Sequence, residues 1–293
     1  MKLPVIRDVL VAEKKVLVRA DLEWPSSAPS TSLRASEGQA WVSQREKVTM
    51  DIVEYLQIRG ADKIKLIGHK GTIAADLRAD PREEANDERL AQELAEGWDI
   101  YVNEAFATSH RRHCSIDALP RLMASQGKIV CVGLRFAEEV EVFSELKPGV
   151  AIIGGAKGDK EEYAKKLENR NWEVLRGGLL PGAKLRPDGL DISDEEIKRL
   201  RDEVAKAETI VLAGPMGKYD VAEKGTKEIF TAVAESKAYK IAGGGDTEAA
   251  LEKFGLKEKM DWISVGGGAM LEFLAKGTLP GIEALITHPQ PLS

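Results

Sequence analysis

Cysteine is scarce in this sequence, with only Cys114 and Cys131 among 293 residues. Two cysteines cannot form the disulfide framework of a small secreted domain, and no CxxC spacing indicates a redox or zinc motif. We expect both side chains to be buried, reduced and inert rather than nucleophilic. The N-terminal segment MKLPVIRDVL is too charged and too short to be a signal peptide. The sequence therefore predicts a cytoplasmic protein.

The sequence also lacks an excess of basic charge and any long apolar run. Its net charge is -6 and its pI is about 5.5, so the chain as a whole does not attract nucleic acid or anionic membranes. No apolar run is long enough to cross a bilayer. We expect no nucleic-acid or membrane partner, and any anion-binding site must be local. The length allows two domains.

Strand-like and helical segments alternate along the chain, which is typical of parallel sheets with crossover helices. The strand-like runs are KKVLVRADL, KIKLIGH, DIYVNEAF and GKIVCVGL in the first half, and GVAIIGGAKG, AETIVLAGPMG, YKIAGGGDT and DWISVGGGAM in the second. The acid-rich segments EEANDERLAQELAEG and DEEIKRLRDE predict helices with solvated charged faces. Residues 26–40 are rich in Ser, Ala and Gly and predict a surface loop.

Between the halves, GLRFAEEVEVFSELKPG predicts one helix with Phe136, Val140 and Phe143 on a shared face. A domain boundary is therefore expected near 134–148.

The two halves offer different chemistry to an anion. In the second half, GGAKGDK, GPMG, GGGDT and VGGGAM place glycines at turns after strands, where bare N–H groups and helix N-termini attract phosphate. In the first half, strands end in arginines and histidines, and arginine binds phosphate or carboxylate in a bidentate manner. These side chains are Arg19, Arg45, His69, Arg78, His110, Arg111, Arg112 and His113, with Asp21 near Arg19. This layout is that of a phosphoryl-transfer enzyme.

Each of these features also has a purely structural interpretation. A single GGG is more often only a tight turn, and the HRRH run fits a solvated charged surface about equally well. Two triglycine turns in consecutive strand–helix units, with GGAK upstream, favour a binding site. Neither turn matches GxGxxG or GxxxxGK[ST]. His110 and His113 are too few, without a paired carboxylate nearby in the sequence, to indicate a transition-metal site, so we expect none.

The motifs together resemble the phosphoglycerate kinase family from end to end. They are VLVRADLEWP, IKLIGHKG, DLRADPREEAND, IYVNEAFATSHRRHCS, VAIIGGAKGDK, TIVLAGPMG, IAGGGDTEAALEKFG and ISVGGGAMLEFLAKGTLPGIEAL. The resemblance implies two Rossmann-like α/β domains of three layers, each with a parallel sheet, joined by a hinge helix. It implies a phosphoglycerate-binding domain over 1–133, the hinge at 134–148, a nucleotide-binding domain over 149–279 and a tail, 280–293, that returns to the first domain.

The resemblance also implies a reaction and its site. The reaction is reversible phosphoryl transfer in glycolysis between 1,3-bisphosphoglycerate and Mg-ADP, giving 3-phosphoglycerate and ATP, by a monomer that closes about its hinge. The positions that match substrate contacts are Asp21, Arg45, His69, Arg78 and Arg111. Those that match nucleotide contacts are Gly154, Gly155, Lys157, Lys160, Asp220, Gly244, Gly245, Asp246 and Thr247. Catalytic roles fall to Arg45, Lys157, Gly245 and Gly268, and the Mg²⁺ ligand is Asp246.

The sequence departs from the family pattern at several positions. Thr72 replaces an arginine after GHKG, and a strand–helix–strand stretch is missing there. A second block is missing between GGAKGDK and LRPDGLDIS, where Gly177 and Gly178 are candidates for its remnant, and Lys160 is a candidate for a displaced family lysine. Glu23 and Ala213 each replace an asparagine.

These departures leave rival interpretations open. The first is a compact active kinase, and the second is a catalytically silent relative that still binds nucleotide. A dinucleotide-binding oxidoreductase is disfavoured, because no GxGxxG with a downstream acid is present.

Overall fold

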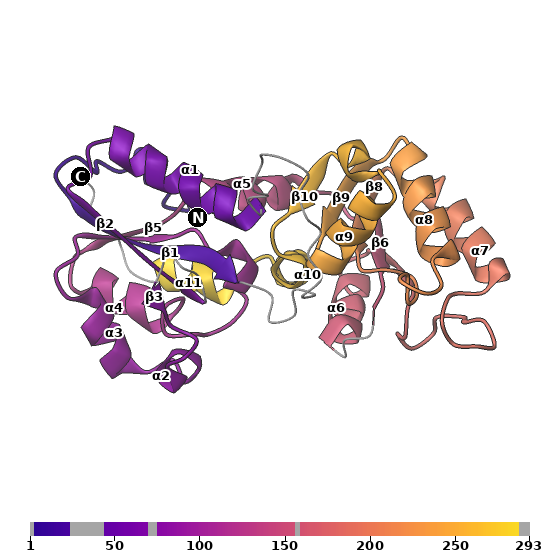
Figure 1. Cartoon of the computed structure of the whole chain (residues 1–293), viewed down its shortest axis with the longest axis horizontal. Coiled ribbons are helices and arrows are strands. Elements are labelled where there is room, and N and C mark those ends of the chain that lie inside the picture. The colour runs from indigo at the N-terminus through magenta and orange to yellow at the C-terminus, as the bar shows by residue number, and fades with distance from the viewer. Residues whose placement is uncertain (1–2, 24–43, 70–74, 156–158, 287–293) are drawn as a thin grey trace, which may run out of the picture. The chain divides into compact units, whose positions relative to one another are not determined.

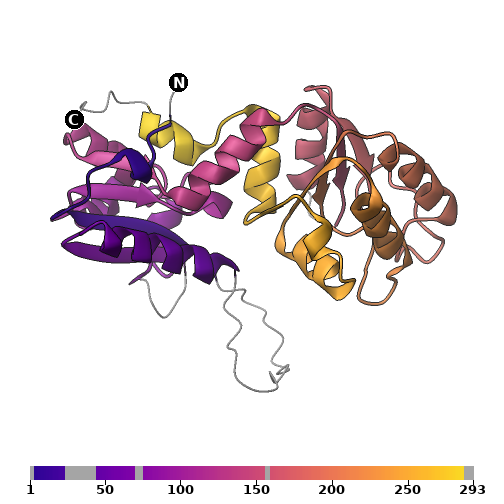
Figure 2. The same cartoon turned by 90° about the horizontal axis from the view of Figure 1, so that it is seen from above.

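The computed structural model describes residues 3–23, 44–69, 75–155 and 159–286. The chain forms two compact units, one made of Met1–Glu141 with Leu279–Ser293 and the other of Val142–Thr278. The division falls inside α5 (Leu134–Glu145), the helix expected over 134–148. Each unit contains a five-stranded parallel sheet covered by helices, which confirms the predicted α/β class (Figures 1 and 2).

The first sheet has the strand order β3-β2-β1-β4-β5. Its strands are β1 (Lys15–Glu23), β2 (Lys63–His69), β3 (Ala75–Asp76), β4 (Ile100–Asn103) and β5 (Ile129–Val132). The chain runs outward from β1 to β3 and then returns to the other side of β1 to form β4. The carboxyl ends of β1 and β4 therefore flank a reversal of strand order, which is where open α/β sheets bind ligands.

Helices cover both faces of the first sheet. Helix α1 (Gln44–Ile58) lies on one face, and α3 (Glu88–Ala95) and α4 (Ala118–Ser125) lie on the other (Figure 1). Ile52 and Leu56, one helical turn apart, are fully buried in a core with Val16 and Val18 of β1. Helix α11 (Pro280–Ile286), near the end of the chain, packs on α4.

The second sheet has the order β10-β9-β8-β6-β7 and reverses between β6 and β8. Its strands are β6 (Val150–Ile153), β7 (Glu173–Arg176), β8 (Thr209–Ala213), β9 (Tyr239–Gly243) and β10 (Trp262–Ser264). Helices α6 (Asp159–Glu168) and α10 (Gly267–Lys276) pack together, and the Tyr163 hydroxyl donates to Glu272 at 2.8 Å. The opposite face buries its core against α7 (Asp194–Val204), α8 (Lys224–Glu235) and α9 (Gly245–Lys253) (Figure 2).

Some details differ from the sequence predictions. The segment EEANDERLAQELAEG forms two helices, α2 (Pro81–Glu84) and α3, because the Asp87 side chain accepts from the backbone N–H groups of Arg89 and Leu90 and so begins a new helix. The prediction of solvated acidic faces is wrong for Glu83 and Glu196, which are both buried. The short strands β3 and β7 were not predicted.

Two further expectations can be compared with the structure. Cys114 and Cys131 are free and fully buried, as predicted. Among the described helices, none combines the length and the apolar character that a bilayer span requires.

Candidate active site

The lysine at the start of α6 lies where the second sheet reverses its strand order. Lys160 donates through Nζ to the carbonyl oxygen of Gly154, after β6, at 2.5 Å and to that of Ala213, at the end of β8, at 3.1 Å. A Cβ on Gly214 would lie 2.4 Å from this Nζ and 2.3 Å from the Gly154 oxygen. Gly214 therefore leaves room beside the ammonium group, which places positive charge at the carboxyl edge of the sheet.

Thr247, in the first turn of α9, joins two of the glycine turns. Its buried hydroxyl donates to the carbonyl of Gly243 at 3.0 Å and accepts from the backbone N–H of Gly214 at 2.7 Å. The loops after β8 and β9 are thus held together by a side chain that the sequence predicted as a nucleotide contact. Here its observed partners are backbone atoms, so its role in the described structure is to fix the shape of the loops.

The two triglycine turns lie against each other. Gly244 has φ +103°, a conformation that favours glycine, and a Cβ on Gly267 would lie 2.8 Å from Gly243 O and from Gly244 Cα. Helices α9 and α10 begin at these turns, so their N-terminal N–H groups lie at the carboxyl edge of the sheet. Gly245 and Gly268 occupy exposed positions in these first turns, where an anion is favoured.

Exposed carboxylates lie near the same turns. Asp246 in α9 and Asp220 after β8 are both exposed, and their charges, after burial, help to raise the pKa of Tyr219 above its ordinary value. An exposed carboxylate beside glycine turns fits Mg²⁺, which proteins hold through one or two carboxylates together with substrate phosphates. The expected ligand Asp246 therefore has suitable chemistry and access for an ion that arrives with a nucleotide.

The first unit fills the carboxyl edge of its sheet with buried polar side chains instead. Arg19 is fully buried in β1, and its Nε donates to Ser115 Oγ at 2.8 Å. Asp21, two residues further along β1, is 1% exposed, and its charge contributes to raising the pKa of Glu104. The Arg19 carbonyl accepts from the backbone N–H of Glu104, which directly follows β4. Arg19 and Asp21, which the sequence places near a strand end, thus lie at the carboxyl edge where the strand order reverses between β1 and β4.

Two histidines and a glutamate form a buried cluster beside Arg19. His69 Nε2 lies 2.9 Å from Glu83 Oε1, and the rings of His69 and His113 lie 5.1 Å apart. Burial and the nearby His69 lower the pKa of His113 to about 4. Glu83 of α2 therefore brings a carboxylate, from 30 positions earlier in the sequence, to the cluster that contains His113.

This cluster bears on the question of a metal site. One donor atom from each of His69, Glu83 and His113 lies within 4.8 Å of the others. His69 Nε2 is hydrogen-bonded to Glu83 Oε1 at 2.9 Å, and the positive charge of Arg19 acts on the same carboxylate. The described contacts of the cluster are hydrogen bonds between buried side chains.

Exposed arginines complete the described part of this edge. Arg78 and Arg111 are exposed, as a contact to a diffusing ligand requires. Arg112 binds Glu283 of α11 at 3.1 Å, and the backbone N–H of Gly281 donates to the Ser109 carbonyl at 3.0 Å. Helix α11 therefore braces the loop that carries Arg111.

Several residues of the predicted site cannot be placed fully in the structure. Lys157 and Thr72 fall outside the described residues. Arg45 lies in α1 and Glu23 ends β1, but their side chains are not described. The backbone register places Glu23 opposite His69.

Glu104 is a buried carboxyl group that the sequence did not single out. It accepts from the backbone N–H groups of Arg135 at 2.9 Å and Phe136 at 3.3 Å, at the N-terminus of α5. Burial raises its pKa to about 8 against these two hydrogen bonds. Gly133 gives it room, since a Cβ there would lie 1.9 Å from Oε2.

Comparison with known proteins identifies the family. A model of the family described as phosphoglycerate kinase matches residues 72–183 and 182–277 of this chain. The chain belongs to the phosphoglycerate kinase family. The phosphoglycerate kinase of Anaeromyxobacter dehalogenans is 30% identical over 357 aligned positions, which cover 96% of this chain and 89% of that protein. The phosphoglycerate kinase of Baumannia cicadellinicola is 28% identical over 380 positions, covering 96% of this chain and 97% of that protein.

Both alignments are longer than the 293 residues of this chain, which is therefore a shortened member of the phosphoglycerate kinase family. The two matched segments meet at 182–183, within the stretch where a block was expected to be missing. The phosphoglycerate kinase structures from Coxiella burnetii and Pyrococcus horikoshii share the fold, each at 22% identity, with TM-scores of 0.76 and 0.72. They cover 97% of this chain, and the matches span 99% and 98% of those chains.

Three residues with buried polar contacts were not among the predicted site residues: Arg19, Glu83 and Glu104. The sequence places Arg19 at a strand end, and its position in VLVRADL was the only indication that it could belong to the site. Glu83 and Glu104 carried no signal of their own, because an acid in an acid-rich helix or after a strand is ordinarily solvated.

Proposed function

We propose that this protein is an active phosphoglycerate kinase, a phosphotransferase that moves a phosphoryl group between 1,3-bisphosphoglycerate and ADP. In the forward direction the bond between the C1 carboxylate oxygen and phosphorus breaks, and a terminal β-phosphate oxygen of ADP bonds to that phosphorus. The products are 3-phosphoglycerate and ATP. The step needs no covalent enzyme intermediate, only alignment and neutralisation of charge on the transferred group.

One observation carries the proposal: within a chain of this family, both sheets present anion-binding chemistry along their carboxyl edges. In the second unit, glycine turns, helix N-termini and Lys160 supply it. In the first unit, Arg19, His69 and the exposed Arg78 and Arg111 supply it. We assign the acid substrate to the first unit and the nucleotide to the second.

The residues then take the following proposed roles. Asp21, Arg45, His69, Arg78 and Arg111 bind the acid substrate. Gly154, Gly155, Lys157, Lys160, Asp220, Gly244, Gly245, Asp246 and Thr247 form the nucleotide site. Arg45, Lys157, Gly245 and Gly268 stabilise the transferred group through charge and backbone N–H donors. Asp246 would hold Mg²⁺, which neutralises phosphate charge when it is bound. The segment 134–148, which contains α5, would serve as the hinge.

The register of β1 favours a second candidate, a nucleotide-binding relative without turnover. Glu23 stands opposite His69, at a position where the family pattern has asparagine. A carboxylate there would repel an anionic acid substrate.

ATP formation from 1,3-bisphosphoglycerate and Mg-ADP tests the proposal. The matched control is Asp246→Asn, which removes the carboxylate without changing its size and also excludes a contaminating host enzyme. We expect turnover by the wild type and at least a roughly tenfold loss in the variant. Mg-ADP binding without turnover in the wild type would favour the silent relative instead. Quenching of NADH fluorescence on addition of the protein would favour a dinucleotide-binding oxidoreductase.

A further inference from the structure

Glu83 is a fully buried carboxylate in α2, outside the set of residues assigned to the substrate. Removing an ionised carboxylate from water costs several kcal/mol unless hydrogen bonds and opposite charge compensate. The hydrogen-bond partners of Glu83 therefore indicate how its burial is compensated and which side chain it orients.

The hydrogen-bond directions around Glu83 can be assigned from donor chemistry. Arg19 can only donate, so its Nε–H at 2.8 Å makes Ser115 Oγ an acceptor and leaves the Ser115 hydroxyl proton for Glu83 Oε1, at 2.5 Å. The Ser115 backbone N–H donates to Oε2 at 2.9 Å. Although burial alone would raise the pKa of Glu83, the bonds from His69 and Ser115 and the charge of Arg19 hold it below its ordinary value. Glu83 is thus an ionised acceptor.

Because Glu83 is ionised, the hydrogen in its contact with His69 can be assigned to one ring nitrogen. An ionised carboxylate has no proton to give, so His69 Nε2 carries the hydrogen in the 2.9 Å contact with Glu83 Oε1. Both side chains are essentially inaccessible to water, with exposures of 1% and 0%. A buried carboxylate in contact with Nε2–H favours the imidazolium form over the neutral ring.

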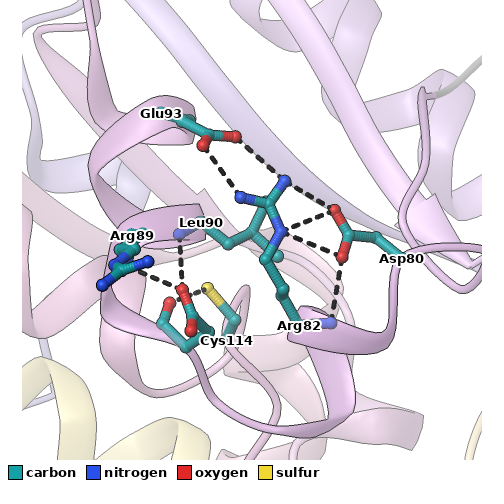
Figure 3. A network of polar contacts seen from close by, with 7 residues as sticks. Asp80, Arg82, Arg89, Leu90, Glu93 and Cys114 are labelled. Atoms are coloured by element: carbon teal, nitrogen blue, oxygen red, sulfur yellow. Dashed lines mark hydrogen bonds and ion pairs between the residues drawn. The ribbon is translucent and has the colours of Figure 1, made fainter.

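The backbone around Glu83 is fixed on both sides. Arg82 binds Asp80 and Glu93 in bidentate fashion, which ties α2 to α3 (Figure 3). On the other side, the backbone N–H of Cys114 donates to the Glu83 carbonyl at 2.8 Å, and Cys114 Sγ lies 3.2 Å from the Asp87 carbonyl. The carboxylate is therefore held at the end of β2 by contacts that do not involve His69.

We propose that Glu83 is a positioning residue that holds His69 as an oriented imidazolium and so adds one positive charge to the anion site of the first unit. The proposal rests on the proposed function, in which His69 contacts the acid substrate. The ligand class is a small carboxylate or phosphate anion, which the added positive charge attracts. His113, neutral above about pH 4, contributes no second charge.

The charged and titratable groups that act on this cluster come from several elements. Among the described residues they include Glu83 from α2, Arg19 from β1, and His113 and Arg111 from the loop after β4. Arg19, Arg111 and a protonated His113 would oppose a charge on His69, whereas the hydrogen-bonded carboxylate of Glu83 favours it. Removing the charge of Glu83 should therefore have a large effect on His69.

The test is an NMR titration of the histidine rings in the whole, ligand-free protein. We expect His69 to titrate above 6.5 in the wild type and at least about one unit lower in Glu83→Gln, which keeps an acceptor oxygen but loses the charge. Glu84→Gln is the matched control, because Glu84 is exposed in the same helix. A wild-type value at or below 6.5, or no change in Glu83→Gln, would overturn the proposal. If Glu83→Gln does not fold, the wild-type value alone decides.

A second readout separates positioning from a merely structural role. Binding of 3-phosphoglycerate, followed through the His69 resonance, should weaken about tenfold in Glu83→Gln, whereas Mg-ADP affinity should stay unchanged. Equal loss of both affinities would mean a structural role and would contradict the proposal. The titration needs no turnover, so an inactive enzyme with a high His69 pKa would refute the proposed function while supporting the role of Glu83.

Discussion

The two units use the same edge of the same kind of sheet in opposite ways. In the first unit the carboxyl edge holds buried charged side chains, with Arg19, Glu83 and His69 in one network. In the second unit the edge consists of backbone, with glycine turns so close that a single Cβ would collide. A backbone site depends on conformation and space, whereas a side-chain site depends on a second layer of partners. The two units should therefore respond differently to mutation and to pH.

The largest effect is expected from a side chain added to the backbone site. In Gly214→Ala, a Cβ would lie 2.3 Å from the Gly154 oxygen, at φ +110°. We expect Mg-ADP affinity to fall about 100-fold and the unfolding free energy by about 3 kcal/mol. Isothermal titration and urea unfolding measure the two. Gly255→Ala is the control, because it also has positive φ (+68°) but no atom within 4 Å. Equal effects at both glycines would contradict the steric account.

A smaller effect is expected when the cation of the backbone site is removed. Lys160→Met keeps the length of the side chain but loses the hydrogen bonds to Gly154 and Ala213. We expect the KM for ADP to rise about 30-fold, with the KM for 3-phosphoglycerate unchanged. Lys165→Met in the same helix, where the lysine is 69% exposed, should change neither constant. A rise in both constants would break the division of ligands between the units.

The exposed arginines of the first unit allow a matched comparison. Arg111→Ala should weaken 3-phosphoglycerate binding about tenfold, because the side chain is exposed to ligand, and should leave the unfolding free energy unchanged. Arg112→Ala removes a 57% exposed partner of Glu283 and should change stability by no more than about 0.5 kcal/mol. Calorimetric titration and thermal unfolding follow both variants. If Arg112→Ala weakens 3-phosphoglycerate binding as strongly as Arg111→Ala does, the proposal that only Arg111 of the two contacts the substrate is wrong.

The smallest effect on ligand binding is expected from Glu104, whose influence should appear in stability against pH. Its pKa is raised from 4.5 to about 8, so the folded state favours the protonated form and stability falls as pH rises from about 4.5 to about 8. The slope should reach at most about 1.4 kcal/mol per pH unit. Glu104→Gln should remove this slope and leave 3-phosphoglycerate affinity unchanged.

Hydrogen exchange of the β4 amides measures this slope for the first unit alone. Glu141→Gln serves as the control, since Glu141 is 54% exposed in the same helix. Parallel pH profiles for wild type and Glu104→Gln would show that Glu104 does not titrate in this range.

The comparison also explains what the sequence could predict. Glycine turns are readable because backbone geometry demands the residue, so GGGDT and VGGGAM indicated the edge of the second sheet. Alternation of strands and helices predicted the fold class. The break before α3 depended on how Asp87 caps the helix, and the burial of Glu83 and Glu104 depended on partners far away in sequence, such as Ser115 and Arg135. Local pattern cannot reveal such partners, nor a strand as short as β3.

Hydrogen exchange with each ligand added alone tests most directly the central claim that acid and nucleotide bind to different units. With Mg-ADP, we expect protection at the turns around Gly214, Gly244 and Gly267 and little change in β1 and β2. With 3-phosphoglycerate, we expect protection around Asp21, His69 and Arg111 and little change at the glycine turns. Protection of the same unit by both ligands, or protection by 3-phosphoglycerate at the glycine turns, would contradict the account.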